Sequence, residues 1–201
     1  MADILDGLAR ASAGAGFAEL ASSLAEVTVQ IRMRGHDGGT GSGIVWRSDG
    51  TIVTNAHVAR GERAAVELSD GRVFDARLER RDPRRDLALL RIDATGLRAA
   101  RLGDSRRLRP GAVVVACGHP FGMSNVVTVG IVHRLIAHPR AAGHAWIGAD
   151  ITLAPGNSGG PLADADGAVV GVNAMIVGGL GVAIPAHAVE RFLGVPARSA
   201  A

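Results

Sequence analysis

Cysteine is almost absent from this chain of 201 residues. The single one, Cys117, lies in an apolar run and is predicted to be a buried strand residue. One cysteine excludes a disulfide bond within the chain, which favours a reducing compartment or a disulfide-free protein of the periplasmic kind. The seven histidines include no pair spaced four residues apart and have no cysteine partner. We therefore expect neither a metal ion nor another cofactor.

Lysine and tyrosine are both missing, and all 22 basic residues are arginine. The formal net charge is only +3, so the arginine excess over acidic residues is modest. Arginines cluster within 77–85 and 106–109, a pattern typical of solvated strand ends and loops. Aromatic residues make up 3% of the chain, and none alternate with these arginines to stack nucleic-acid bases. We expect no nucleic-acid partner.

Long apolar runs are missing as well. No stretch reaches the roughly 18 apolar residues that a membrane-spanning helix needs, so we expect no membrane span. The start of the sequence, from Met1 to Asp6, is acidic and lacks the basic residues and continuous apolar stretch of a secretory signal. These features predict a cytoplasmic protein, with export by another route as the alternative.

Glycine is abundant, at 28 residues, and it separates short runs in which apolar and polar residues alternate. Alternation with a period of two predicts β-strands, and turn residues such as Ser48-Asp49-Gly50 predict the tips between them. Two sets of six strands predict an all-β fold of two six-stranded antiparallel β-barrels. The predicted strands are 27–33, 42–47, 51–54, 64–69, 72–80 and 87–91, then 113–116, 126–135, 145–150, 161–163, 168–176 and 180–184.

Helical segments are predicted at both ends of the chain. Apolar residues spaced three and four apart indicate a helix over 3–24, with Gly14 and Gly16 as the point where it breaks. This arm either packs against the barrels or mediates self-association. A short helix is predicted over about 185–193, with Pro185 in its first turn and Gly194 as its stop. The predicted domains are an arm (1–24), a first barrel (25–98), a linker (99–111), a second barrel (112–184) and a C-terminal helix with its tail (185–201).

Two segments of the first strand set carry candidate catalytic residues. His57 lies on a turn directly after the predicted strand 51–54, where a side chain can point into a cleft. Asp86 precedes a strongly apolar strand, and a carboxylate at the mouth of a buried strand needs hydrogen-bond donors. The Nδ1–H group of His57 is a candidate donor. Taken alone, each residue is more typical of a structural role.

The most specific segment is 154–161, with the sequence Ala-Pro-Gly-Asn-Ser-Gly-Gly-Pro. Its glycines permit unusual backbone dihedrals around Ser158 and a close approach of substrate. The N–H groups of Gly156 and Ser158, with that of Asn157 near them, are candidates for an oxyanion hole. A serine hydroxyl needs a base, and the base needs an orienting carboxylate. The order His57, Asp86, Ser158 matches the chymotrypsin-like arrangement and predicts a catalytic triad.

These motifs resemble the protease domain of HtrA/Deg-type serine proteases. The resemblance extends from Glu26 to Leu193, and the matching segments are 41–45, 54–58, 86–90, 118–122, 130–132, 156–162 and 182–185. It implies the chymotrypsin-like double barrel and a serine endopeptidase that acts through an acyl-enzyme, without ATP, on unfolded or flexible proteins. Because relatives commonly form trimers through N-terminal segments, it also implies a homo-oligomer assembled through the arm.

The sequence departs from the family pattern in three places. Members usually carry a C-terminal PDZ domain, for which this chain leaves no room. His119 occupies a position where the family commonly has asparagine, in a loop expected near the active site. The stretch 136–145 is short for a loop that senses activators. Regulation by peptides bound to a PDZ domain is therefore not expected.

The resemblance also places a specificity pocket for the residue before the scissile bond. Thr152 is expected at its floor and Leu153 beside it, facing a second wall made by Ala174, Met175 and Ile176. A pocket that accepts arginine or lysine needs an acidic residue, which this lining lacks. The small and apolar lining predicts cleavage after small aliphatic residues such as valine, alanine or isoleucine.

Two other interpretations stay open on the residues alone. The segment 156–160 also satisfies the G-x-S-x-G pattern of α/β-hydrolase esterases, with Asp164 and His187 in the places of the other triad members. That fold alternates strands with helices, whereas this chain is rich in strands. The second alternative is a catalytically silent protease-fold protein that binds or scaffolds, and the complete triad argues against it.

Overall fold

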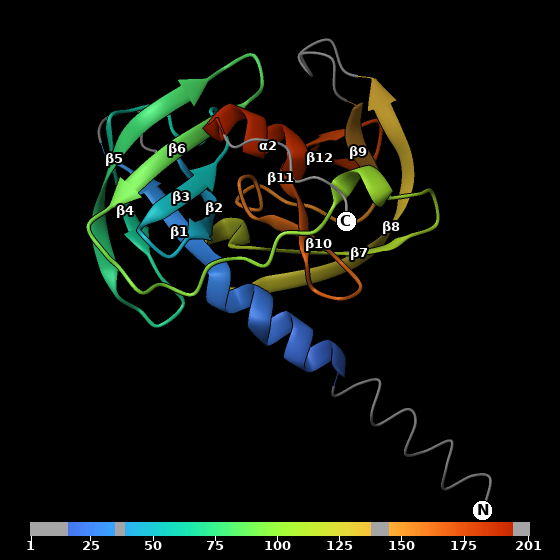
Figure 1. Cartoon of the computed structure of the whole chain (residues 1–201), viewed down its shortest axis with the longest axis horizontal. Coiled ribbons are helices and arrows are strands. Elements are labelled where there is room, and N and C mark those ends of the chain that lie inside the picture. The colour runs from blue at the N-terminus through green and yellow to red at the C-terminus, as the bar shows by residue number, and fades with distance from the viewer. Residues whose placement is uncertain (1–15, 35–38, 138–144, 195–201) are drawn as a thin grey trace, which may run out of the picture.

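The computed structural model describes residues 16–34, 39–137 and 145–194. Two closed six-stranded barrels lie side by side, the first drawn in blue to green and the second in yellow to red in Figure 1. Every neighbouring pair of strands in both barrels is antiparallel. The expected fold class is therefore confirmed.

The strands follow the alternating pattern of the sequence. In the first barrel, with spatial order β1-β2-β3-β6-β5-β4, they are β1 (Thr28–Met33), β2 (Thr40–Arg47), β3 (Thr51–Thr54), β4 (Arg63–Glu67), β5 (Val73–Asp82) and β6 (Leu87–Ile92). In the second barrel, with order β10-β11-β12-β9-β8-β7, they are β7 (Val113–Gly118), β8 (Val126–Ala137), β9 (Ala145–Asp150), β10 (Pro161–Asp164), β11 (Val169–Val177) and β12 (Leu180–Pro185).

Helices are few and short. Residues 16–27 form the N-terminal helix, which continues beyond the predicted end at 24, so β1 begins at Thr28; the predicted helical residues 3–15 lie outside the described ranges. Two 3₁₀ helices lie within the described residues, η1 (Ser105–Arg107) and η2 (Pro120–Gly122). The helix α2 (Ala186–Leu193) ends at Gly194, whose φ of +75° is the left-handed conformation that glycine adopts readily. None of the helices within the described ranges is both long and apolar enough to cross a membrane.

Successive residues of a strand face two different hydrophobic clusters. In the first barrel, Ile52 and Leu90 belong to the cluster inside the barrel, whereas their neighbours Val53 and Leu89 belong to a cluster shared by both barrels. Because side chains alternate across a strand, one face fills the barrel and the other meets the second barrel. Fully burying a leucine or valine side chain contributes about 1.5–3 kcal/mol.

The second barrel repeats this division. Val114 lies in its interior cluster, and the adjacent Val115 and Cys117 lie in the shared cluster. Cys117 is buried with a free thiol, as the sequence predicted. The shared cluster therefore fixes how the two barrels meet, and with them the residues at their junction.

The helix α2 closes this junction and lies across it in Figure 1. Its residues Val189 and Phe192 are buried in the shared cluster. Arg80 of β5 donates to the Phe192 carbonyl oxygen and covers the Phe192 ring, with 5.6 Å between the guanidinium carbon and the ring centroid. A helix that follows the second barrel in sequence is thus bonded to the first.

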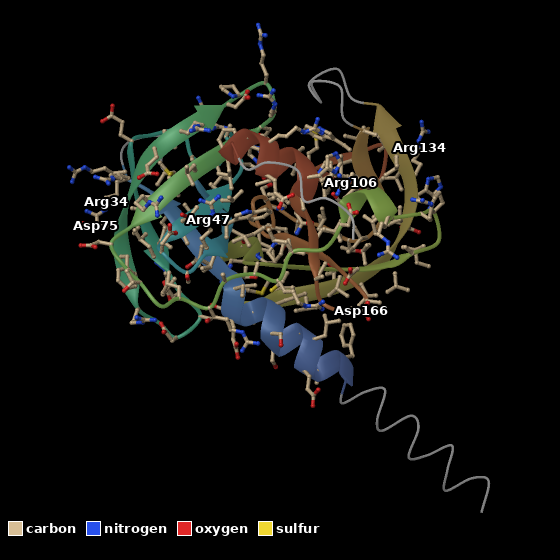
Figure 2. All side chains as sticks on the ribbon, viewed as in Figure 1. Arg34, Arg47, Asp75, Arg106, Arg134 and Asp166 are labelled. Carbon is tan, nitrogen blue, oxygen red and sulfur yellow. The ribbon has the colours of Figure 1, made fainter. Side chains whose placement is uncertain are left out.

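The charged side chains labelled in Figure 2 lie at the outside of the barrels. Arg34 and Asp75, for example, form an ion pair at the edge of the first barrel, and both side chains are more than half exposed. Exposed ion pairs of this kind contribute little to stability because water screens them. The charged residues therefore determine the character of the surface and contribute little to the stability of the fold.

Candidate active site

His57 and Asp86 are brought together by the pairing of two strands. β3 and β6 are antiparallel neighbours, with Thr54 opposite Ala88. His57 follows the end of β3 and Asp86 precedes the start of β6, so the register places both at the same end of the pair. The distance from His57 Nδ1 to Asp86 Oδ2 is 2.8 Å and to Oδ1 is 3.0 Å.

The Asp86 carboxylate fixes the orientation of the imidazole. Its Oδ1 also accepts the backbone N–H of His57 at 3.0 Å. Because a carboxylate only accepts hydrogen bonds, Nδ1 carries a proton, and Nε2 is the nitrogen that can act as a base in the neutral ring. Asp86 is 5% exposed, while the His57 side chain is 39% exposed. The buried carboxylate thus presents a basic nitrogen on a ring that solvent and substrate can reach.

The backbone of Asp86 is held in an uncommon conformation. Its φ of +56° lies in the left-handed region, which aspartate tolerates better than most residues. The side-chain amide of Asn55, fully buried, donates to the Asp86 carbonyl oxygen at 3.0 Å. Asn55 therefore holds the backbone while His57 binds the side chain.

Ser158 is half-buried on the loop of residues 155–160, called here the Ser158 loop, directly before β10. Its hydroxyl donates to the carbonyl oxygen of Ala174 in β11 at 3.1 Å. Among the hydrogen bonds of the described residues, none joins Ser158 Oγ to the His57 ring. His57 is therefore paired with Asp86, whereas the Ser158 hydroxyl is bound to the backbone of β11.

The glycine after Ser158 permits the close contact between the barrels. A Cβ atom on Gly159 would lie 2.0 Å from the Ser42 carbonyl oxygen and 2.2 Å from Thr54 Oγ1, and its φ is +88°. Both contacts are impossible for any other residue, and the dihedral is unfavourable for one. Thr54 is the last residue of β3, immediately before the His57 turn. Gly159 thus lets the Ser158 loop rest against the strand that carries His57.

The peptide groups of the Ser158 loop are anchored by their carbonyl oxygens. The carbonyls of residues 155, 156, 157 and 158 all accept a hydrogen bond within the protein. In that order the donors are Phe121 N–H at 3.1 Å, Ser42 Oγ–H at 2.7 Å, Gly160 N–H at 3.0 Å and Ser42 N–H at 2.8 Å. The loop is therefore held in one conformation from both barrels.

Two N–H groups of this loop have no acceptor within the part of the chain that the structure describes. Asn157 N–H donates to the Ala154 carbonyl oxygen at 3.0 Å and is therefore occupied. The hydrogen bonds of the described ranges include none donated by the N–H of Gly156 or Ser158. Of the three groups predicted for the oxyanion hole, these two remain able to bind a negatively charged oxygen.

A cavity of about 270 Å³ lies beside Ser158. Its walls carry no charged side chain, and its lining residues are Leu153, Ala154, Pro155, Asn157, Ser158, Ala174, Met175 and Ile176. Four of the five predicted pocket residues therefore meet there. Thr152, expected at the floor, is exposed and does not belong to this lining.

The family model described as trypsin-like peptidase domain matches residues 41–172. The chain belongs to the trypsin-like peptidase family. Membership of this family explains the double-barrel fold and the segments that meet at the junction of the two barrels.

Its similarity to HtrA-type proteins is considerable. The chain is 42% identical over 156 residues to the putative serine protease HhoB of Synechocystis sp., across 73% of this chain. It is 43% identical over 162 residues to the serine protease HTRA1B of Danio rerio, across 77% of this chain. It spans only 38% and 34% of the length of these two relatives. The solved structure of the HtrA-type protease AlgW with a tripeptide has a TM-score of 0.82 at 35% identity, covering 89% of this chain and 62% of that one.

The residues of the alternative esterase triad lie elsewhere in this trypsin-like domain. Asp164 Oδ1 accepts the backbone N–H groups of Asp166 and Ala168 within its own turn. His187, on α2, places Nδ1 2.8 Å from the Ser105 hydroxyl. Both residues have partners that hold them in the scaffold, and the fold is not that of an α/β-hydrolase. Within the described residues, no group of three or more His, Cys, Asp or Glu is placed to bind a metal ion.

Sequence reasoning gave no role to Ser42 and noted His119 only as a departure from the family. Both side chains are buried at the Ser158 loop, and His119 N–H donates to Ser42 Oγ at 2.9 Å. Burial lowers the pKa of the His119 imidazole below its usual value of 6.5, while Glu67 opposes this shift and Arg32 adds to it. The one available signal was a serine between two glycines, Gly41-Ser42-Gly43, in a strand that pairs with the His57 strand.

Proposed function

We propose that the chain is a serine endopeptidase that hydrolyses peptide bonds through an acyl-enzyme, with His57, Asp86 and Ser158 as its triad. The observation that carries the proposal is the His57–Asp86 pair, because Asp86 binds Nδ1 and leaves Nε2 to act as the base. Membership of the trypsin-like peptidase family and similarity to HtrA-type proteases support it further.

In the first half of the reaction, His57 Nε2 takes the proton of Ser158 as Oγ attacks the scissile carbonyl. Asp86 stabilises the imidazolium that forms. The carbonyl oxygen becomes an oxyanion and binds the N–H groups of Gly156 and Ser158. The imidazolium then protonates the leaving amine, and the acyl group stays on Ser158. In the second half a water molecule repeats these steps and releases the acid.

Before attack, the Ser158 hydroxyl must leave the Ala174 carbonyl oxygen. β11 pairs with β10 only as far as Val172, so Ala174 and the residues after it have an open side toward the cavity. A substrate in an extended conformation adds there as a further strand, and its backbone N–H competes for the Ala174 oxygen. Only an unfolded or flexible segment can adopt that conformation, which supports such proteins as substrates.

The apolar cavity sets the preference for the residue before the cut. Its volume of about 270 Å³ is modest, and Met175 and Ile176 provide apolar walls. A lysine or arginine would bury an unpaired charge, at a large cost in free energy. Valine, alanine and isoleucine suit this pocket, and discrimination among them is loose because one methylene changes binding by only about 1–3 kcal/mol.

A second candidate is a catalytically silent protein with the same fold. The Ser158–Ala174 hydrogen bond favours it, since a hydroxyl held there is not activated by His57. This candidate predicts binding of extended peptides in the same cavity without turnover.

Casein digestion separates the two candidates. We expect the chain to degrade casein, with fragment ends that follow valine, alanine or isoleucine when mapped by mass spectrometry. Ser158→Ala should abolish cleavage, whereas Ser124→Ala, at an exposed serine, should retain it. Intact casein after incubation with the unsubstituted chain would support the silent protein, and cuts mainly after arginine, lysine or large aromatic residues would contradict the pocket.

A further inference from the structure

Ser42 connects the two barrels behind the candidate active site. It lies on β2 and is fully buried. Its backbone N–H donates to the Ser158 carbonyl oxygen at 2.8 Å, and its own carbonyl accepts the Thr54 hydroxyl at 2.7 Å. Thr54 ends the strand that leads to His57. One residue of the first barrel therefore contacts both the Ser158 loop and the strand that carries the histidine.

The Ser42 hydroxyl has its full set of hydrogen bonds. It donates its proton to the Gly156 carbonyl oxygen at 2.7 Å and accepts the His119 N–H at 2.9 Å. His119 Nδ1 lies 3.3 Å from the same oxygen. A hydroxyl has one proton and two acceptor positions, and the Gly156 carbonyl can only accept. Nδ1 must therefore be a donor, which assigns the Nδ1–H tautomer to His119.

These bonds matter because Gly156 has no side chain to restrict its own backbone conformation. Its φ is +108°, and glycine moves readily among such backbone states. Ser42 holds the carbonyl of Gly156, and Phe121 N–H holds the preceding carbonyl, that of Pro155. In a trans peptide the N–H points away from the carbonyl, so a held Pro155 oxygen aims the Gly156 N–H to the opposite side.

We propose that Ser42 and His119 are positioning residues that lock the Ser158 loop in the conformation in which the N–H groups of Gly156 and Ser158 bind the oxyanion. This inference rests on the proposed endopeptidase function. Both side chains are buried and act through the Gly156 carbonyl, without touching the substrate. His119 donates to Ser42, and that donation strengthens the bond from Ser42 to Gly156.

The chain contains a matched pair that serves as the control. Ser105 is buried, its Oγ lies 2.8 Å from His187 Nδ1, and it accepts the His187 N–H at 3.2 Å. This pair joins η1 to the first turn of α2 rather than to the Ser158 loop. Replacing either serine by alanine removes the same kind of buried hydroxyl, so a general loss of stability affects both variants alike.

The kinetic test compares Ser42→Ala with Ser105→Ala on one peptide substrate. Ser42→Ala should lower kcat about 10- to 100-fold with little change in KM, because the oxyanion forms only after binding. Ser105→Ala should keep kcat near that of the unsubstituted chain. His119→Leu should lower kcat, and His119→Asn should restore most of it, since an amide N–H can replace Nδ1–H. Equal kcat values for Ser42→Ala and Ser105→Ala would overturn the inference.

A second measurement does not depend on turnover. In ¹⁵N–¹H spectra, the amide signals of Gly156 and Ser158 should shift or broaden in Ser42→Ala and stay in place in Ser105→Ala. Unchanged signals in Ser42→Ala would refute the positioning role even in a catalytically silent protein. Loss of activity in Ser158→Ala tests the proposed function separately, so the failure of one proposal can be told from the failure of the other.

Discussion

Single residues at the barrel junction differ in how readily the sequence reveals them. His57 and Asp86 were predicted because each stands beside an apolar strand in a specific motif, and the β3–β6 register brings them within hydrogen-bond distance. Ser42 and His119 belong to matching motifs too, but Ser42 Oγ donates to the Gly156 backbone carbonyl, and His119 acts on that carbonyl only through Ser42. Backbone partners have no sequence signature, so only the structure assigns these bonds. Thr152, by contrast, does not line the cavity beside Ser158, and the loop geometry that sets this lining cannot be read from residue spacing.

The first prediction concerns the orienting carboxylate. Asp86→Asn should lower kcat by about 10⁴-fold, because an amide that donates to Nδ1 favours the wrong tautomer of His57. Folding should persist, since asparagine also tolerates a positive φ. Peptide hydrolysis rates measure the effect. Asp82→Asn, at an aspartate that binds Arg85, is the control, and a larger loss there would show that the acid is misassigned.

The second prediction concerns His119 and pH. Because burial lowers its pKa in the folded protein, the unfolded chain binds a proton at a higher pH than the folded chain does. As the pH falls below about 6.5, the free energy of unfolding should therefore decrease. Urea unfolding at several pH values checks this. The variant His119→Asn keeps every other titrating group, so its free energy of unfolding should depend less on pH. Identical pH profiles for the variant and the unsubstituted chain would contradict a buried, neutral His119.

Elements were predicted more fully than their boundaries. Alternation of apolar and polar residues identified the strands, since the side chains of a strand point alternately to two faces with different surroundings. Strand ends moved by one or two residues where turns and bulges intervene, as at β5, which extends to Asp82 rather than 80. The sequence did not indicate η2, in which Phe121 has a φ of +53°. That conformation depends on contacts with the Ser158 loop, which lies far away in the sequence.

The third prediction tests how closely two elements pack. Gly159→Ala would place a methyl group against Ser42 and Thr54 at a positive φ, so it should destabilise the protein by at least about 2 kcal/mol. Gly111→Ala is the matched control, because Gly111 has a φ of +89° and no atoms near the added methyl. Thermal unfolding of both variants separates the packing effect from the dihedral effect, and equal losses would contradict the close contact.

At the scale of the whole molecule, the two-barrel fold followed from the count of strands, whereas assembly did not. The N-terminal helix packs on the barrels through Leu20, Leu24 and Val27, while Phe17 is 42% exposed. An apolar side chain on an extended arm is compatible with both alternatives, a packing arm and a contact between copies. The sequence of one chain does not distinguish them.

The fourth prediction is that this arm mediates self-association into a trimer. Light scattering should report an oligomer for the full chain and a smaller species for Phe17→Ser. Val73→Ser, at another exposed apolar residue on the first barrel, should leave the mass unchanged. A monomeric full chain would refute the proposal.

The central claim is that Ser158 is activated as a nucleophile, and covalent labelling tests it most directly. A fluorophosphonate reacts with an activated serine hydroxyl, and digestion followed by mass spectrometry locates the adduct. We predict one adduct, on the fragment that contains Ser158. An adduct on another serine, or labelling that persists in Ser158→Ala, would contradict the account.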